Sequence, residues 1–286
     1  MGAQIVSEIP SMASVFAKAA KTLGRKPKDP VLPQTVLVFQ GAHADPEKLN
    51  EYRRAVGAPM NAVLPSLYVH SLAFPLAMSL MLHDDFPLPL LGMIHLSNHV
   101  DVAAPLGEGE AFDVEVHSEN LRAHSKGAMC DLVIRIVADG KDRMLLRSTF
   151  LAKGVKLSGE KPRSSERTAF DMPVRTAHWK LDAGTGRRWA KVAGDYNPIH
   201  LSALSAKVLG MPGAIAHGIY MAARALAGIE PGRGSYSWNI EFKTPVVLPA
   251  AVDLAFEPTA HGYRVNAWHA RKGKPHFELE LSAAGS

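Results

Sequence analysis

The sequence predicts an α+β fold in which one structural unit occurs twice along the chain. An apolar stretch at residues 68–81 precedes short segments in which apolar and polar side chains alternate, and the same order returns from residue 215. Such segments, separated by turns with Gly and Pro, are typical of antiparallel strands. One helix wrapped by an antiparallel sheet is the hot-dog arrangement, so we expect a double hot dog. A generic α+β protein with one sheet and two helices is the alternative.

Spacing along the chain supports a duplication. From His70 to Pro105 is 35 positions and from His217 to Pro249 is 32, so one three-residue indel aligns the two units. Upstream, the motif YRRAVG of the first unit aligns with WAKVAG of the second. This alignment places His70 and the serine after it where the second unit has His217 and a glycine.

The individual elements follow from periodicity and turn residues. The stretch 215–228 repeats apolar residues at helical spacing and ends in Gly228, which suits a C-terminal cap. The stretch 68–81 is the matching helix, and Pro75 should kink or shorten it. Alternation predicts strands at 111–116, 129–137, 144–152, 236–243, 251–257, 263–270 and 276–282. The polar, basic segment 153–167 is interpreted as a linker, which divides the chain into units 1–155 and 156–286.

Composition limits the classes of function. The 286 residues contain one cysteine, Cys130, so no disulfide forms within the chain and a reducing, cytoplasmic location fits. No uncharged apolar run approaches the roughly 18 residues that span a bilayer, so we expect no membrane insertion. The formal net charge of +5 favours anionic partners. The only short basic cluster, at 24–28, has no nucleic-acid-binding signature beside it, and the histidines show no metal-ligand spacing.

The segment 193–220 carries the candidate chemistry. Asp195 offers a carboxylate and His200 an imidazole that exchanges protons near neutral pH. Pro198 predicts a loop or first helical turn between them, and Asn197 can fix that loop with its side chain. The pair can therefore converge on one water molecule. An ordinary turn with a surface histidine is the alternative.

A second element follows in the pair His217-Gly218, at the predicted start of a core helix. The first N–H groups of a helix lack intrahelical partners and carry partial positive charge. Gly218 has no side chain to keep a ligand from its N–H, so it predicts an oxyanion site for a thioester carbonyl. His217 either takes part in catalysis or orients the turn by hydrogen bonding. Water addition across an enoyl thioester, or its reverse, uses all these groups and needs no metal.

The segment GDYNPIHLSALSAKVLGMPGAIAHGIYM resembles the hydratase motif of the MaoC-like dehydratases, the (R)-specific enoyl-thioester hydratases. The resemblance implies that Asp195 and His200 activate water, leaving open which of them handles the proton at carbon 2. It also implies that Asn197, beside Gly194 and Pro198, organises the loop, and that Gly218 holds the thioester oxygen. The substrate would be an acyl thioester of fatty acid metabolism, carried by coenzyme A or an acyl carrier protein, with no separate cofactor. The first unit resembles the degenerate half of double hot-dog members.

Two departures from the family pattern stand out. Leu226 and Ala227 occupy the helix where simpler members often have a serine. The first unit has no Asp-x-Asn-Pro-x-His, so one active site per chain is expected, with the first half as scaffold and wall of the acyl pocket. A hot-dog thioesterase and a non-catalytic acyl-binding module are the competing functions. A homodimer is compatible with exposed sheet edges.

Overall fold

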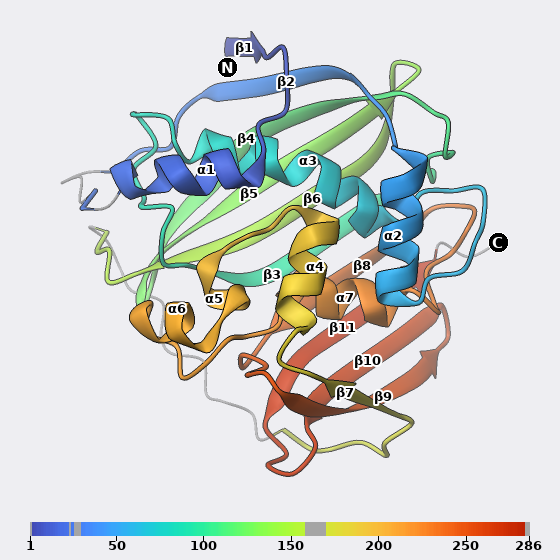
Figure 1. Ribbon diagram of the computed structural model, residues 1–286. Coiled ribbons are helices and arrows are strands. Elements are labelled where there is room, and N and C mark those ends of the chain that lie inside the picture. Colours follow the sequence, from blue (N-terminus) through green and yellow to red (C-terminus); the bar gives the residue numbers. More distant parts are fainter. Residues whose placement is uncertain (1, 23, 26–29, 158–169, 284–286) are drawn as a thin grey trace.

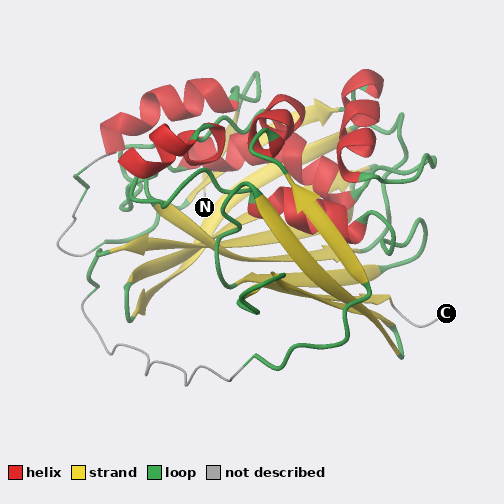
Figure 2. Cartoon of the chain, turned by 60° about the horizontal axis from the view of Figure 1, so that its bottom comes forward, coloured by secondary structure: helices red, strands yellow, loops and turns green. Residues whose placement is uncertain are grey.

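The computed structural model describes residues 2–22, 24–25, 30–157 and 170–283, and these form one continuous sheet covered by helices (Figure 1). The sheet has 11 strands in the order β1-β2-β4-β5-β6-β3-β8-β11-β10-β9-β7. Figure 2 shows the helices gathered on one side of this sheet. The predicted α+β fold with an antiparallel sheet wrapped around central helices is confirmed.

The strand order repeats in two units. Starting from the centre of the sheet, the N-terminal unit reads β3-β6-β5-β4-β2 and the C-terminal unit reads β8-β11-β10-β9-β7. The N-terminal unit contains β2 (Thr35–Ala42), β3 (Met93–Val102), β4 (Phe112–His124), β5 (Gly127–Ala138) and β6 (Lys141–Lys153). The C-terminal unit contains β7 (Ala177–Leu181), β8 (Tyr236–Phe242), β9 (Ala250–Thr259), β10 (Gly262–His269) and β11 (Pro275–Ala283). Every strand predicted from alternation is present.

The units meet where β3 pairs with β8 in antiparallel register, with His99 opposite Asn239. β1 (Gly2–Ile5) adds a parallel strand at the outer edge of the N-terminal unit. The helices are α1 (Met12–Ala19), α2 (Pro46–Val56), α3 (Ser66–Leu80), α4 (Thr185–Ala193), α5 (Pro198–Leu201), α6 (Ala203–Val208) and α7 (Gly218–Leu226), and a short 3-10 turn spans Ala20–Thr22. Side chains of both units contribute to one buried apolar core.

The hydrogen bonds correct the predicted alignment of the units. An isolated bridge joins Val63 to Gly107 in the first unit, and the matching bridge joins Ile215 to Val247 in the second. Each bridge precedes its central helix by the same number of residues, since α3 begins at Ser66 and α7 at Gly218. The match of His70 with His217 is therefore wrong, because Pro65 precedes Ser66 just as His217 precedes Gly218.

Aromatic contacts support the corrected alignment. Tyr52 contacts Tyr68 at 5.4 Å between ring centroids, and Trp189 contacts Tyr220 at 5.3 Å. Tyr68 and Tyr220 are each the third residue of their helix. The upstream match of YRRAVG with WAKVAG therefore agrees with the structure, because it pairs Tyr52 with Trp189.

Three further expectations have clear outcomes. Pro75 lies inside α3, which nevertheless runs on to Leu80, because most side chains of that helix are buried and their packing offsets the lost hydrogen bond. Gly228 is not the cap of α7, whose last turn closes through a hydrogen bond from the Ala227 N–H to the Ala223 carbonyl. Cys130 is fully buried in β5, and burial raises its pKa to about 12. It is therefore a structural thiol.

Other expectations fall at the limits of the described residues. Much of the predicted linker 153–167 and most of the basic cluster 24–28 lie outside them. The division into residues 1–155 and 156–286 therefore stays a prediction. Among the described helices, none combines the length and apolar character of a membrane-crossing segment.

Candidate active site

The loop after α4 is shaped by two local signals. Gly194 ends α4 in the left-handed conformation, with φ of 71°, which an L side chain rarely adopts. The chain then turns through Asp195 to Asn197, the N-cap of α5, whose side-chain oxygen accepts a hydrogen bond from the Ile199 N–H at 3.3 Å. Pro198 occupies the first helical position, where its missing N–H costs nothing. This confirms the helical turn expected between the carboxylate and the imidazole.

The imidazole of His200 is fixed by backbone groups far from it in sequence. Its Nδ1 lies 2.8 Å from the Ile215 carbonyl oxygen, which can only accept, so Nδ1 carries the proton. The Nε2 atom of a neutral His200 is then an acceptor. The Ile215 N–H in turn donates to the Ile199 carbonyl at 3.0 Å. Gly186 of α4 permits this packing, because a Cβ there would overlap the carbonyl oxygen of His200.

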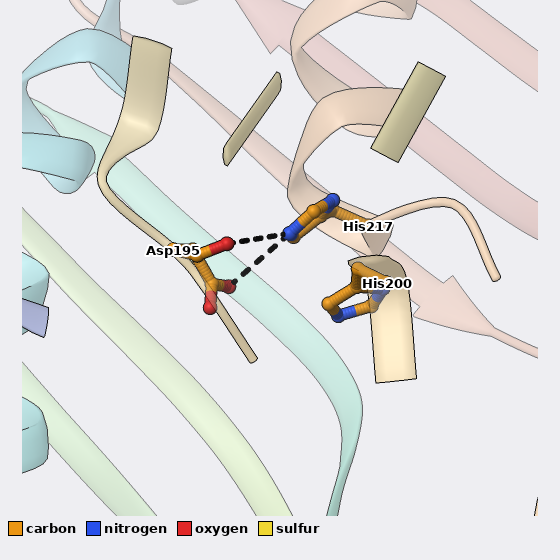
Figure 3. A group of neighbouring side chains, drawn as sticks. All are labelled: Asp195, His200 and His217. Carbon is orange, nitrogen blue, oxygen red and sulfur yellow. Dashed lines mark hydrogen bonds and ion pairs between the residues drawn. The ribbon is translucent and has the colours of Figure 1, made fainter. Parts of the chain in front are cut away.

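The structure brings His217 to the same place. Its Nε2 donates to the backbone carbonyl of Asp195 at 3.0 Å and lies 3.8 Å from the Asp195 carboxylate. The rings of His200 and His217 stack with centroids 3.6 Å apart. Figure 3 shows the carboxylate and the two imidazoles converging from three separate segments of the chain. Of these three side chains only Asp195 is appreciably exposed, at 23%. Solvent and substrate therefore reach the cluster from the side of Asp195.

Burial controls the ionisation of the cluster. It raises the pKa of the Asp195 carboxyl, against the opposing effects of nearby His200 and the Asn197 N–H. Burial lowers the pKa of His200, although nearby Asp195 and the hydrogen bond to the Ile215 carbonyl oppose this effect. Burial also lowers the pKa of His217 well below its ordinary value. Both imidazoles are therefore neutral at pH 7. A neutral His200 presents a lone pair rather than a positive charge.

Gly218 lies at the start of α7, as the sequence predicts. The first hydrogen bond of this helix runs from the Met221 N–H to the His217 carbonyl, so the Gly218 N–H precedes the intrahelical pattern. A Cβ on Gly218 would come within 2.9 Å of the ring of Phe242. Glycine is therefore required here by the packing of Phe242. The hydrogen bond from His217 to the Asp195 carbonyl ties this helix start to the loop.

The three side chains could also be considered as metal ligands, since one ligand atom of each lies within 4.8 Å of the others. The hydrogen bonds argue against a three-ligand site. The Nε2 of His217, which faces Asp195, is protonated because its partner is a carbonyl oxygen, and a protonated nitrogen cannot bind a metal ion. His200 uses its Nδ1 in the same way. The donor set fits hydrogen bonding to an oxygen atom better than it fits a metal.

The N-terminal unit has no copy of the loop that carries Asp195. Nine positions separate Gly57 from Ser66, whereas 24 separate Gly194 from Gly218. The additional residues of the C-terminal unit contain α5 and α6. The described residues of the chain therefore contain one cluster of this kind.

Charged side chains fill the equivalent place in the N-terminal unit. Arg53 is 2% exposed and donates a hydrogen bond to the Val63 carbonyl at 3.0 Å. In the alignment of the two units, this carbonyl corresponds to the Ile215 carbonyl, which accepts a hydrogen bond from His200. Arg53 also pairs with Glu108 at 2.6 Å. At the start of α3, the carboxylate of Glu230 accepts a hydrogen bond from the Ser66 N–H at 2.9 Å. The helix start that corresponds to Gly218 is thus occupied by a carboxyl oxygen of the protein itself, from a group whose pKa is raised by burial.

Sequence reasoning missed Gly186, Phe242, Arg53 and Glu230. The first two act by close packing between segments distant in the chain, for which a single sequence has no signal. The two charged residues could have been suspected, because Arg53 lies in an otherwise apolar helical face and Glu230 directly follows the apolar run of α7. Their partners were not predictable without the fold.

Known proteins match this chain over most of its length. A family profile described as MaoC like domain matches residues 165–273. The chain is 33% identical over 270 residues to 3-hydroxyacyl-thioester dehydratase X of Mycobacterium tuberculosis, covering 93% of this chain and 95% of that protein.

Solved structures agree with this match. The crystal structure of HtdX of Mycobacterium tuberculosis superposes with a TM-score of 0.76 at 30% identity, covering 87% of this chain and 100% of that one. A MaoC-like dehydratase from Phytophthora capsici superposes with a TM-score of 0.68 at 16% identity, covering 89% and 97%, and this likeness concerns the fold alone.

Proposed function

Because this chain belongs to the family of the MaoC-like 3-hydroxyacyl-thioester dehydratases, we propose that it interconverts (R)-3-hydroxyacyl thioesters and trans-2-enoyl thioesters with loss or gain of water. The observation that carries the proposal is the hydrogen bond of 3.0 Å between His217 and the Asp195 carbonyl. It holds the Asp195 carboxylate beside the N-terminus of α7, and the His200 imidazole, bonded to the Ile215 carbonyl, stacks on His217 at the same place. A water molecule and a thioester carbonyl can then be bound side by side.

In the direction of hydration, water lies between the Asp195 carboxylate and the Nε2 of His200. Its oxygen bonds to carbon 3 of the enoyl thioester while one of its protons passes to the pair. The double bond shifts its electrons to carbon 2 and the carbonyl oxygen, and the Gly218 N–H stabilises the resulting enolate. A proton from the pair then goes to carbon 2. Dehydration is the same sequence in reverse.

The other residues position these groups. Gly194, Asn197 and Pro198 set the turn between Asp195 and α5. We assign His217 an orienting role, because its Nε2–H is already committed to the Asp195 backbone. The neutral state of His200, favoured by burial, suits an acceptor for a water proton.

We infer that the reaction uses no separate cofactor, since the carbonyl is polarised by a backbone N–H and water is activated by side chains. Coenzyme A or phosphopantetheine enters as part of the substrate, a thioester of fatty acid metabolism. A cytoplasmic location is supported by the single buried thiol of Cys130.

The test follows the absorbance of the enoyl-thioester group on addition of crotonyl-CoA. Wild type should hydrate the substrate, and Asp195→Asn and His200→Ala should each lower kcat by at least about a hundredfold. Leu204→Ser, on the exposed face of α6, is the folded control. Release of free thiol by wild type would instead identify a thioesterase, and full activity of either site variant would contradict the assigned roles.

A further inference from the structure

The surface around the candidate site is basic. Between residues 183 and 229 the sequence contains five Lys and Arg residues, and Asp195 is the only acidic one. Arg188 pairs with Asp182 at 2.9 Å, and Arg224 stacks over Trp179 at 4.5 Å. The remaining three cations, Arg187, Lys191 and Lys207, are exposed and have no carboxylate partner within the described part of the chain.

The outer face of α6 is apolar, although it faces solvent. Leu204 and Val208 lie one helical turn apart and are 76% and 79% exposed, and Leu209 is 45% exposed. The small Ala206 is the residue that this helix buries. Four of the eleven large apolar residues that are exposed in the described chain fall between residues 196 and 209. Such clustering on a surface indicates a binding face rather than scattered exposure.

This face lies beside the candidate site. α6 follows directly after α5, which carries His200, and the Ser205 hydroxyl donates to the Pro198 carbonyl at 2.7 Å. Arg187 of α4 donates to the Leu201 carbonyl at 3.0 Å, so the cations of α4 belong to the same surface. Tyr196, next to Asp195, is 43% exposed. The site therefore reaches solvent close to the apolar face.

We propose that the α6 patch, defined as Leu204, Val208 and Leu209 with Arg187, Lys191 and Lys207, docks a small acidic carrier protein that delivers its acyl thioester to Asp195 and His200. This rests on the proposed function. The phosphates of coenzyme A would require cations but would leave the apolar side chains uncovered. An acidic helical protein covers both, because its carboxylates meet the cations while its own apolar side chains meet Leu204 and Val208.

The experiment compares one acyl group on two carriers. Crotonyl is presented as crotonyl-CoA and as crotonyl linked to the phosphopantetheine of a purified acidic acyl carrier protein. The double variant L204S/V208S and the charge reversal Lys207→Glu should each lower kcat/KM for the carrier-protein substrate about tenfold or more, while kcat/KM for crotonyl-CoA changes less than about twofold. Val174→Ser, 85% exposed on another segment, should change neither.

Salt and direct binding complete the test. Raising the salt concentration from about 0.05 to 0.5 M should weaken the carrier-protein reaction more than the crotonyl-CoA reaction, since exposed charges are screened. Binding of the acyl carrier protein, measured by fluorescence anisotropy, should fall in the patch variants even if turnover is absent. The measurement therefore separates failure of docking from failure of the proposed reaction.

Three results would overturn the docking proposal. Equal losses on both substrates would mean that the patch supports the site itself. Unchanged kinetics and binding in both patch variants would mean that the carrier protein docks elsewhere. Dissociation of a wild-type dimer by L204S/V208S, seen by light scattering without a carrier-specific effect, would identify the patch as an interface between copies of this chain.

Discussion

The carboxylate of Glu230 accepts a hydrogen bond from the backbone N–H of Ser66 at 2.9 Å, at the helix start that corresponds to Gly218 in the other unit. The Tyr236 hydroxyl donates to the same oxygen at 2.8 Å, and the Trp238 indole donates to the Ser66 hydroxyl at 3.0 Å. A carboxyl oxygen that accepts from one helix start supports an oxygen-binding role for the other.

Removing the carboxyl group of Glu230 should destabilise the protein without silencing the active site. Glu230→Ala leaves the Ser66 N–H and the Tyr236 hydroxyl without their acceptor, so the free energy of unfolding should fall by about 2–3 kcal/mol in urea. Glu230→Gln keeps an oxygen acceptor and should cost about half as much. Formate added at high concentration should raise the Tm of Glu230→Ala but not that of wild type. Equal costs for both variants, with no effect of formate, would contradict the interpretation.

Arg53 should be as important to stability as a core residue. It is buried and donates to the Asn61 and Val63 carbonyls as well as to Glu108. Arg53→Met should lower the free energy of unfolding by about 2–3 kcal/mol, because these acceptors lose their donor while the partly exposed Glu108 can turn to water. Arg54→Met, on the exposed side of the same helix, should change it by less than about 0.5 kcal/mol. A similar cost for the two variants in urea unfolding would refute the assignment.

The packing of Phe242 against Gly218 gives a steric prediction. Gly218→Ala should lower kcat/KM for crotonyl-CoA about a hundredfold, because the new methyl group meets the Phe242 ring and displaces the helix start. The double variant G218A/F242L should recover most of the loss. Gly228→Ala, where a Cβ meets nothing within 4 Å, should leave the rate unchanged. If the double variant stays as slow as Gly218→Ala, the ring is not the cause.

The ionisation of the site predicts the pH profile. Burial lowers the pKa of His200 from 6.5, so its imidazole is neutral at and above that pH, and burial raises the pKa of Asp195 from 3.8. The two groups titrate as a pair. The kcat/KM for crotonyl-CoA should therefore be flat from about pH 7 to 9 and decline only below about pH 6.5. A rate that falls by tenfold per pH unit above pH 7 would show instead that a protonated imidazole is required.

Two histidines outside the site, the buried His70 and the partly buried His95, should make the fold acid-sensitive. Burial lowers the pKa of His70 to about 3 and that of His95 to about 4. Since both values lie below the unfolded value of about 6.5, each group contributes full stability above pH 6.5 and loses it as the pH falls toward its folded value. As the pH falls from 6.5 to 5, each of these two histidines should lower the free energy of unfolding by about 2 kcal/mol.

Substitution isolates this effect. His70→Leu should reduce the loss between pH 6.5 and 5 by about 2 kcal/mol in urea unfolding. Phe74→Leu is the matched control, because Phe74 stacks on His70 at 4.8 Å but does not titrate. It should lower stability equally at both pH values. An unchanged pH dependence in His70→Leu would show that this imidazole is already protonated in the folded protein.

The sequence alone determined what depends on local rules. Alternation located seven of the 11 described strands, since a side chain's face follows from its place in the strand, and it missed β1, β2, β3 and β7. The motif from Gly194 to Gly218 predicted the turn at Asn197 and Pro198 and the helix start at Gly218, because caps and proline act within a few residues. The same motif carried the resemblance that the comparisons confirmed.

Tertiary structure decided what depends on distant partners. The hydrogen bond of His200 to the Ile215 carbonyl and that of His217 to Asp195 join segments 15 and 22 positions apart, so the tautomers follow only from packing. The register of the two units was fixed by bridges, which corrected the match of His70. The hydrogen bond between Glu230 and the Ser66 N–H, at the start of α3, joins residues 164 positions apart. A linear pattern names residue types, whereas the carbonyl or ring that each one meets is set by how the two units pack.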